Sequence, residues 1–349
     1  MKTSRQPSGS RLISMKSRAR GYNLVELMIG LTLGLFLLGG VISIFIATQQ
    51  ANRATDSLSR IQENARMAFE LTARDIREAG GNPCNRSNPV ANVLKDAEDN
   101  PWSNWVGGIT GYSTDAAFNA AFPAIGTGTG AGQHIAGTHA LTVMGASGTS
   151  LSVVEHQPKS AQFKVNTKEH GINDGDILMA CDFGLTSIFQ VTNANASNVT
   201  IVHNTGGSVS PGNCTKGLGL PVTCTTNGTE HTFGPNSQLV RFVASTWYVG
   251  ASGRNDTSGN PINSLFRIVN NGAALEMIEG VDNMQLSYLV RGANTYVAAP
   301  AATAWPNVTA VRIVLTLSGT ETGTRSDNLN NNRLQRTVTQ IITLRSRQS

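Results

Sequence analysis

The most unusual ionisable group in this chain of 349 residues is Glu26, at the start of a long apolar segment. From Leu27 to Ala47, Thr32 and Ser43 are the only polar side chains that interrupt this segment. A carboxylate inside a lipid bilayer is costly and needs a partner. Glu26 is therefore either a docking group for a cation at membrane depth or a side chain that snorkels to the headgroups.

Four cysteines, Cys84, Cys181, Cys214 and Cys224, form neither a CxxC motif nor a Cys/His metal spacing. An even number of cysteines outside the cytoplasm favours two disulfides, and free or partly paired thiols are the alternative. Cys214 and Cys224 are close in sequence, so the simplest pairing is local and leaves Cys84 with Cys181. Of three possible connectivities we prefer this one, because its second bridge closes a long loop, where a cross-link has most effect.

The sequence contains no recognisable catalytic or metal-binding motif. The segment from Gly126 to Gly130 alternates glycine and threonine but lacks the Lys-Ser/Thr of a phosphate loop, and no GxSxG nucleophile motif occurs. We therefore expect no enzyme, no cofactor and no metal site. Six histidines lack a metal-ligand spacing and are expected to be solvated in loops: His134, His139, His156, His170, His203 and His231.

The positive charge of the chain is concentrated at its N-terminus. The net charge is +5, but residues 1–21 contain six cations and no acid, and removing these six from +5 leaves −1. A body that binds nucleic acid is therefore not supported. Cations next to an apolar segment mark the cytoplasmic side of a membrane helix.

A single long helix is expected to carry Glu26. At about 1.5 Å per residue, Leu27–Ala47 would span about 31 Å, enough to cross the hydrocarbon core. Between Thr48 and Ala79 apolar residues recur every three or four positions, which predicts an amphipathic continuation. Gly80-Gly81-Asn82-Pro83 should end the helix, which would then run from about residue 23 to 79.

After an irregular connection from Cys84 to about His139, short apolar segments separated by turn residues predict an antiparallel, meandering sheet. Residues 273–280 could instead form a short helical turn. The expected strands are Ala140–Met144, Leu151–Glu155, Gln162–Val165, Asp176–Cys181, Ser187–Thr192, Asn198–His203, Leu239–Tyr248, Ser264–Val269, Met284–Val290, Ala310–Leu317 and Thr337–Leu344.

The residues from Gly21 to Glu26 resemble the class III signal of type IV prepilins: a basic leader, a glycine, and a carboxylate five residues later at the start of an apolar segment. The resemblance implies that prepilin peptidase cleaves between Gly21 and Tyr22 and that the new N-terminus on Tyr22 is methylated. Tyr22 replaces the usual Phe, and the apolar segment lacks the proline of many major pilins. Glu26, the fifth mature residue, could then pair with the α-amino group of Tyr22 in its own chain or a neighbour.

Segments at both ends and in the middle of the chain resemble the PilW family of minor pilins. The resemblance implies an α+β fold, in which a long N-terminal transmembrane and amphipathic α-helix packs on an antiparallel β-sheet domain (pilin-like). The segments that carry it are 58–66, 73–80, 175–178 with Cys181, 188–192, 279–285, 310–313 and 343–347. Residues 85–140 and 204–235 match nothing in that family and are interpreted as insertions.

The resemblance also implies a place in the cell and a set of partners. The expected parts are a cleaved leader (1–21), a helix (22–80, with 24–47 in the membrane) and a β-rich domain (81–349). The domain would be periplasmic before assembly, and the chain would be part of the pilus afterwards. A minor-pilin complex would prime pilus assembly at or near the tip and support twitching motility and adhesion. Expected partners are other minor pilins, the major pilin, prepilin peptidase/methyltransferase, a tip adhesin protein and the inner-membrane assembly platform.

Two other functions fit the same residues. A pseudopilin of a type II secretion system shares the N-terminal signal and a β-rich domain. Alternatively, the chain itself could be a tip adhesin that binds a surface or a ligand through the segments 85–140 and 204–235, although decoration of the domain surface is the favoured interpretation of these segments.

Overall fold

The computed structural model describes residues 21, 23–84, 88–322, 329–330 and 333–347. The chain forms two compact units, Met1–Asn52 and Arg53–Ser349. Helix α1 spans Leu24–Glu78, which confirms the expected long helix. The other helices in the described residues are α2 (Asp115–Ala121) and the 3-10 turns η1 (Ala97–Asp99), η2 (Pro158–Ser160), η3 (Ala302–Asn307) and η4 (Arg345–Arg347).

The second unit is rich in strands, all but one of whose pairings are antiparallel, as expected for an α+β fold. The described strands are β1 (Val90–Asn92), β2 (Ile109–Tyr112), β3 (Ala140–Gln157), β4 (Gln162–Val165), β5 (Ile177–Cys181), β6 (Thr186–Gln190), β7 (Asn193–Ala194), β8 (Thr200–Val202), β9 (Gln238–Asn255), β10 (Pro261–Val269), β11 (Leu275–Glu279), β12 (Val281–Val290), β13 (Val308–Thr322), β14 (Leu329–Asn330) and β15 (Arg333–Thr343).

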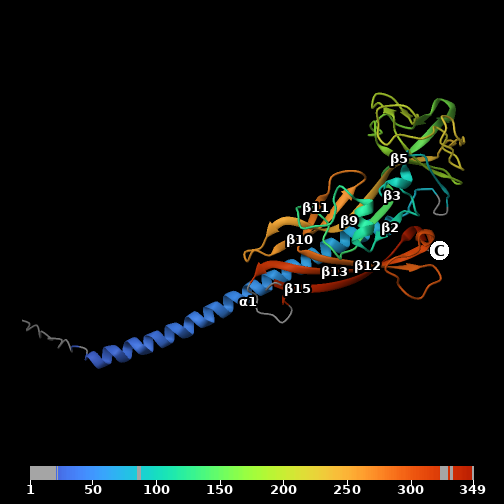
Figure 1. The fold of residues 1–349 in the computed structure, drawn as a ribbon. Coiled ribbons are helices and arrows are strands. Elements are labelled where there is room, and N and C mark those ends of the chain that lie inside the picture. The colour runs from blue at the N-terminus through green and yellow to red at the C-terminus, as the bar shows by residue number, and fades with distance from the viewer. Residues whose placement is uncertain (1–20, 22, 85–87, 323–328, 331–332, 348–349) are drawn as a thin grey trace, which may run out of the picture. The chain divides into compact units, whose positions relative to one another are not determined.

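Two sheets replace the single sheet that the sequence suggested. The larger has the order β1-β6-β5-β9-β3-β4-β8-β7, with β2 added to β3 and the pair β10–β11 added to β9. The smaller has the order β12-β13-β15-β14. Strands that follow one another in the chain pair with each other in β9–β10–β11 and in β12–β13. The expected meander is therefore present within parts of each sheet. The long strands of both sheets lie along the part of α1 that begins at Arg53 (Figure 1).

Three other expectations about local structure were wrong or incomplete. Residues 275–279 form β11 and not a helical turn, because pairing with β10 overrides the helix propensity of Leu, Glu and Met. The expected strands Ala140–Met144 and Leu151–Glu155 are one strand, β3, which continues through an irregular register. The connection from Cys84 to His139 contains β1, β2 and α2, and Thr114 caps α2 by accepting a hydrogen bond from the amide of Ala117.

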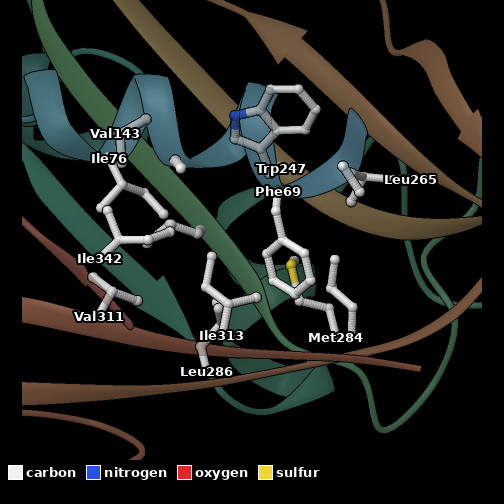
Figure 2. Packing of buried hydrophobic residues seen from close by; sticks show 14 of the residues in the cluster. Phe69, Ile76, Val143, Trp247, Leu265, Met284, Leu286, Val311, Ile313 and Ile342 are labelled. Carbon is white, nitrogen blue, oxygen red and sulfur yellow. The ribbon is translucent and has the colours of Figure 1, made fainter. Parts of the chain in front are cut away.

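The main hydrophobic core lies where α1 meets both sheets. Figure 2 shows Phe69 and Ile76 of α1 among side chains from β3, β9, β12 and β13, including Val143, Met284 and Ile313. A second core fills the region around β4, β5, β6 and β8, with Phe163 and Phe189 fully buried. The helix therefore contributes one side of the domain core, which fixes its C-terminal half in place.

Candidate functional site

The first unit presents an exposed apolar helix surface. From Asn23 to Asn52 every described residue is exposed except Gly34, which is half-buried. The segment has the length and hydropathy to cross a membrane. The hydroxyls of Thr32 and Thr48 donate to backbone carbonyls one turn earlier, so these side chains place no unpaired donor on the surface. Such a surface requires lipid or neighbouring apolar helices around it.

The predicted cleavage and docking residues lie at the beginning of this helix. Gly21 is exposed and precedes the helix, and Tyr22 lies outside the described residues. Glu26 is exposed in the first turn, where the amide ends of the helix favour a negative charge. An added Cβ at Gly30 or Gly34 would meet nothing within 4 Å, so both glycines leave room for another helix to approach.

The C-terminal part of α1 packs against the domain through a largely apolar face whose side chains range from small to large. Its buried residues include three alanines that let the helix lie close to the strands. At Gly319 of β13 an added Cβ would lie 2.0 Å from the hydroxyl oxygen of Ser57, so a side chain there would have to displace this hydroxyl. The buried residues are Ser57, Ile61, Ala65, Ala68, Phe69, Thr72, Ala73 and Ile76.

A polar cluster at the end of this face fixes the helix to β9 and β10. The indole Nε1 of Trp247 donates to Asp75 Oδ2 at 2.9 Å, and Arg267 Nη2 lies 3.1 Å from the same oxygen. The Arg267 guanidinium lies 5.3 Å from the centre of the Trp247 ring and also donates to Ser245. Sequence patterns did not identify this cluster, because Asp75 lies 172 positions before Trp247 in the chain.

The chain after the helix is anchored by backbone and side-chain contacts. Gly80, at φ +69°, donates its amide to the carbonyl of Met144 at 2.8 Å. The hydroxyl of Ser346 donates to the carbonyl of Ala79 at 2.6 Å, and Arg347 donates to the carbonyl of Gly107. The C-terminal turn η4 therefore closes over the end of α1.

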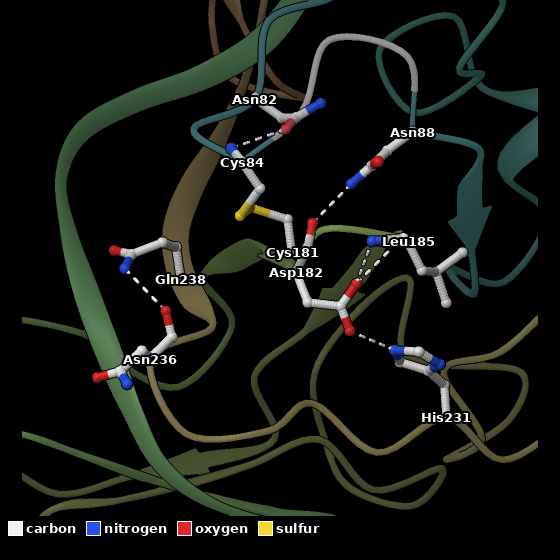
Figure 3. The surroundings of a disulfide bond; sticks show 10 residues. Asn82, Cys84, Asn88, Cys181, Asp182, Leu185, His231, Asn236 and Gln238 are labelled. Carbon is white, nitrogen blue, oxygen red and sulfur yellow. Dashed lines mark hydrogen bonds and ion pairs between the residues drawn. A yellow bond between two sulfur atoms is a disulfide. The ribbon is translucent and has the colours of Figure 1, made fainter.

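The structure joins Cys84 to Cys181 and Cys214 to Cys224, the same pairs that the sequence argument preferred. Cys84 follows the helix and Cys181 ends β5, so the first bond links the helix end to the larger sheet across 97 residues (Figure 3). Next to it, His231 Nε2 lies 2.7 Å from Asp182 Oδ2, which joins the segment 204–235 to the end of β5.

The expectation that all six histidines are solvated was wrong. His134, His156, His170 and His203 are buried. His156 stacks on Phe163, and its Nε2 lies 3.2 Å from Nε2 of His203. Aromatic packing replaces water around the His156 and His203 rings, and Nδ1 of His203 has no hydrogen-bond partner among the described residues. Burial without such a partner favours the neutral imidazole.

The hydrogen bonds of this pair determine its tautomers. His156 Nδ1 accepts the amide of Phe233 at 3.1 Å, so Nε2 of His156 carries the proton and donates to His203. Burial, with a smaller effect of His231, lowers the pKa of His156 to about 4, and burial together with the His156 ring lowers the pKa of His203 to about 3. Among the described residues, no group of three His, Cys, Asp or Glu side chains is placed to hold a metal ion.

The family model PilW, described as type IV pilus-assembly protein W, matches residues 246–347. The matched residues extend from β9 to η4 and include Trp247, Arg267 and the whole smaller sheet. No curated protein and no solved structure matches the chain. The long N-terminal helix and the β-rich domain fit a component of pilus assembly. The C-terminal part of the chain, residues 246–347, is therefore similar to the PilW family of type IV pilus-assembly proteins.

Proposed function

We propose that this chain is a minor pilin of a type IV pilus, anchored in the inner membrane before assembly and held in the filament core afterwards. The observation that carries the proposal is the exposed apolar surface of α1 between Leu24 and Ile46. Exposing this surface to water would be unfavourable both before and after assembly. Lipid would cover it before assembly, and a bundle of pilin helices would cover it afterwards. The match to the PilW family favours the pilus over a type II secretion pseudopilus.

Glu26 is the proposed docking group. Cleavage between Gly21 and Tyr22 would create an α-amino cation four residues before Glu26. In the membrane or in the filament core, an ion pair between Glu26 and such a cation on a neighbour is stronger than in water because the dielectric constant is low. A subunit would then enter the filament in the register that brings these two charges together.

The orientation and partners follow from the same arrangement. The basic leader would remain cytoplasmic, and the domain would be periplasmic, where both disulfides can form. Prepilin peptidase/methyltransferase would process the leader at Gly21, and the inner-membrane assembly platform would receive the mature chain. Other minor pilins, the major pilin and a tip adhesin protein would be its neighbours in a complex that primes assembly and supports twitching motility.

The test is incorporation of full-length variants into sheared pili, measured by immunoblot against the amount in membranes. We expect Glu26→Ala to reduce the pilus fraction at least tenfold while the membrane amount stays unchanged. Glu63→Ala is the matched control, because Glu63 is an exposed carboxylate on the same helix. Wild-type incorporation of Glu26→Ala would contradict the docking role, and loss of exoprotein secretion with normal twitching in a deletion strain would favour the pseudopilus.

A further inference from the structure

Two histidine rings lie against the aromatic side chains of the second core. His156 of β3 and His203, which follows β8, are buried beside Phe163 and Phe233. The ring centroids of His156 and Phe163 are 4.0 Å apart, and those of the two histidines are 5.3 Å apart. Both imidazoles are therefore shielded from bulk water.

The neutral pair already uses both of its acceptor nitrogens. His156 Nδ1 accepts the amide of Phe233 at 3.1 Å, so the proton of this ring is on Nε2. That Nε2 donates to His203 Nε2 at 3.2 Å, which leaves the proton of His203 on Nδ1. The folded pair therefore has no free lone pair for an additional proton.

A proton taken up from water at either nitrogen has the same consequence. On His156 Nδ1 it would make this nitrogen a donor that faces the amide donor of Phe233. On His203 Nε2 it could be accepted by the neighbouring ring only if the proton of His156 moved to Nδ1. Both routes place a donor opposite the Phe233 amide, so protonation and this contact exclude each other.

The strands around the pair supply no counterion. Glu155 Oε2 of β3 and Lys164 Nζ of β4 lie 2.6 Å apart and neutralise each other. Because successive side chains of a strand point to opposite faces, this ion pair lies on the other face from His156 and Phe163, which are opposite each other in the same two strands. Strands β5, β6 and β8 contain no charged residue.

The segment 204–235 also disfavours a charge on the pair. Burial, His156 and then Lys216 lower the pKa of His203, and burial with a smaller effect of His231 lowers the pKa of His156. Asp182, at the end of β5, is already bonded to His231, whose Nε2 lies 2.7 Å from Asp182 Oδ2 (Figure 3). A protonated ring therefore needs water as its partner, and water can reach it only when the core opens.

The stretch that contacts His156 is short and has separate attachments at its two ends. Residues 231–234 have no regular secondary structure, and Phe233 is fully buried. The carbonyl of Thr229 and the amide of Asn236 form backbone hydrogen bonds of 2.8 and 2.9 Å outside this stretch. An opening at Phe233 can therefore remain confined to the residues between these two attachments.

We propose that the pair His156–His203 is an acid-sensitive switch, in which uptake of a proton displaces the amide of Phe233 and releases residues 230–235 from the second core. The released stretch would expose the Phe233 ring, so the domain would present apolar surface in acid that it buries at neutral pH. This device acts within the domain and is independent of Glu26.

The experiment measures hydrogen–deuterium exchange of the full-length protein in detergent at pH 7 and pH 5, with correction for the intrinsic effect of pH on exchange. The readout is a peptide that covers residues 230–235, and the reference is a peptide from β12 in the main core. The double variant His156→Gln/His203→Gln replaces both rings by amides, which form hydrogen bonds but take up no proton between pH 5 and pH 7.

His139→Gln is the matched control. His139 Nδ1 also accepts a backbone amide, that of Leu286 at 3.0 Å, but this contact lies on β12 and outside the second core. If the switch belongs to the pair in the second core, this variant should keep the wild-type response of residues 230–235.

We expect exchange of residues 230–235 in the wild type to be at least tenfold faster at pH 5 than at pH 7, with β12 unchanged. The reason is that one exposed ring with the ordinary pKa of 6.5 favours the open form by about thirtyfold at pH 5. The double variant should lose this acceleration.

The proposal is overturned if residues 230–235 are not accelerated in the wild type, if they and β12 are accelerated equally, or if the double variant keeps the acceleration. The comparison of the two peptides within the wild type decides the outcome even if the double variant does not fold.

Discussion

Trp247 Nε1 and Asp75 Oδ2 lie 2.9 Å apart and join β9 to α1 by a hydrogen bond between mostly buried groups. The contact anchors α1 to the larger sheet near the C-terminal end of the helix. Burial of the apolar face of α1 opposes separation of the helix from the sheets. The contacts of the Asp75 carboxylate fix how the helix is rotated about its axis and how far it is shifted along that axis. The helix is thus held by shape and by a directional polar contact.

Removal of this carboxylate is expected to destabilise the domain. Asp75→Ala would leave Trp247 Nε1 without an acceptor and Arg267 without its anion, at a cost of about 2–4 kcal/mol in the free energy of unfolding. Denaturant unfolding followed by tryptophan fluorescence measures this loss. Asp56→Ala, at an exposed position of the same helix, should change stability by less than about 0.5 kcal/mol. Equal stability of the two variants would contradict the anchoring role of Asp75.

The two disulfides should differ in their contribution to stability. The Cys84–Cys181 bond closes a loop of 97 residues, and the chain-entropy model gives about 4.7 kcal/mol for a loop of about 100 residues. The Cys214–Cys224 bond closes a loop of 10 residues, for which the same relation gives about 2.7 kcal/mol. Thermal unfolding of the variants Cys84→Ser/Cys181→Ser and Cys214→Ser/Cys224→Ser should therefore show the larger loss for the first pair. The reverse order would show that strain or residual structure outweighs loop length.

The buried histidine pair should make stability depend on pH. Burial lowers the pKa of His156 to about 4, below its usual 6.5, so the unfolded chain binds protons more readily than the folded one. Stability is then complete above about pH 6.5 and decreases as the pH falls towards the folded-state pKa, by about 2 kcal/mol at pH 5 for one such group. Denaturant unfolding at pH 7 and pH 5 measures the difference.

His203→Phe tests the origin of that dependence. His203 is fully buried, and its pKa is lowered to about 3 by burial and by His156. Phenylalanine has no proton to exchange, so the loss of stability between pH 7 and pH 5 should become smaller by about 2 kcal/mol. Lys168→Ala should keep the wild-type dependence. An unchanged pH profile in His203→Phe would assign the effect to other groups.

Processing at the N-terminus can be checked by the mass of the mature chain. Cleavage between Gly21 and Tyr22 followed by methylation should give a chain that begins with N-methylated Tyr22 and lacks all six leader cations. Gly21→Val should leave the precursor uncut, because a branched side chain replaces the hydrogen atom beside the bond to be broken. Gly30→Ala, on the open helix surface, should be processed normally. A mature N-terminus at any other residue would contradict the assignment.

Patterns of neighbouring residues were sufficient to predict the elements that neighbouring residues determine. The apolar segment after Glu26, the periodicity to Ala79 and the stop at Gly80 predicted α1 to within one residue at each end. Alternating apolar residues located most strands, and close spacing of Cys214 and Cys224 favoured the pairing that the structure contains. Residues 275–279 were ambiguous, because their propensity favours a helix and only the partner strand β10 decides for β11.

The sequence by itself determined the order of the parts, which is a membrane-length helix with a carboxylate near its start followed by a β-rich domain, and its four cysteines favoured two disulfides. Only the tertiary structure decided which distant residues share a site. It brought Asp75 to Trp247, His156 to His203, and the segments 85–140 and 204–235 to one pocket. The reason is that hydrophobic periodicity reports which face of an element is buried, but not which other element covers it. That choice depends on packing between residues far apart in the chain, which no local pattern records.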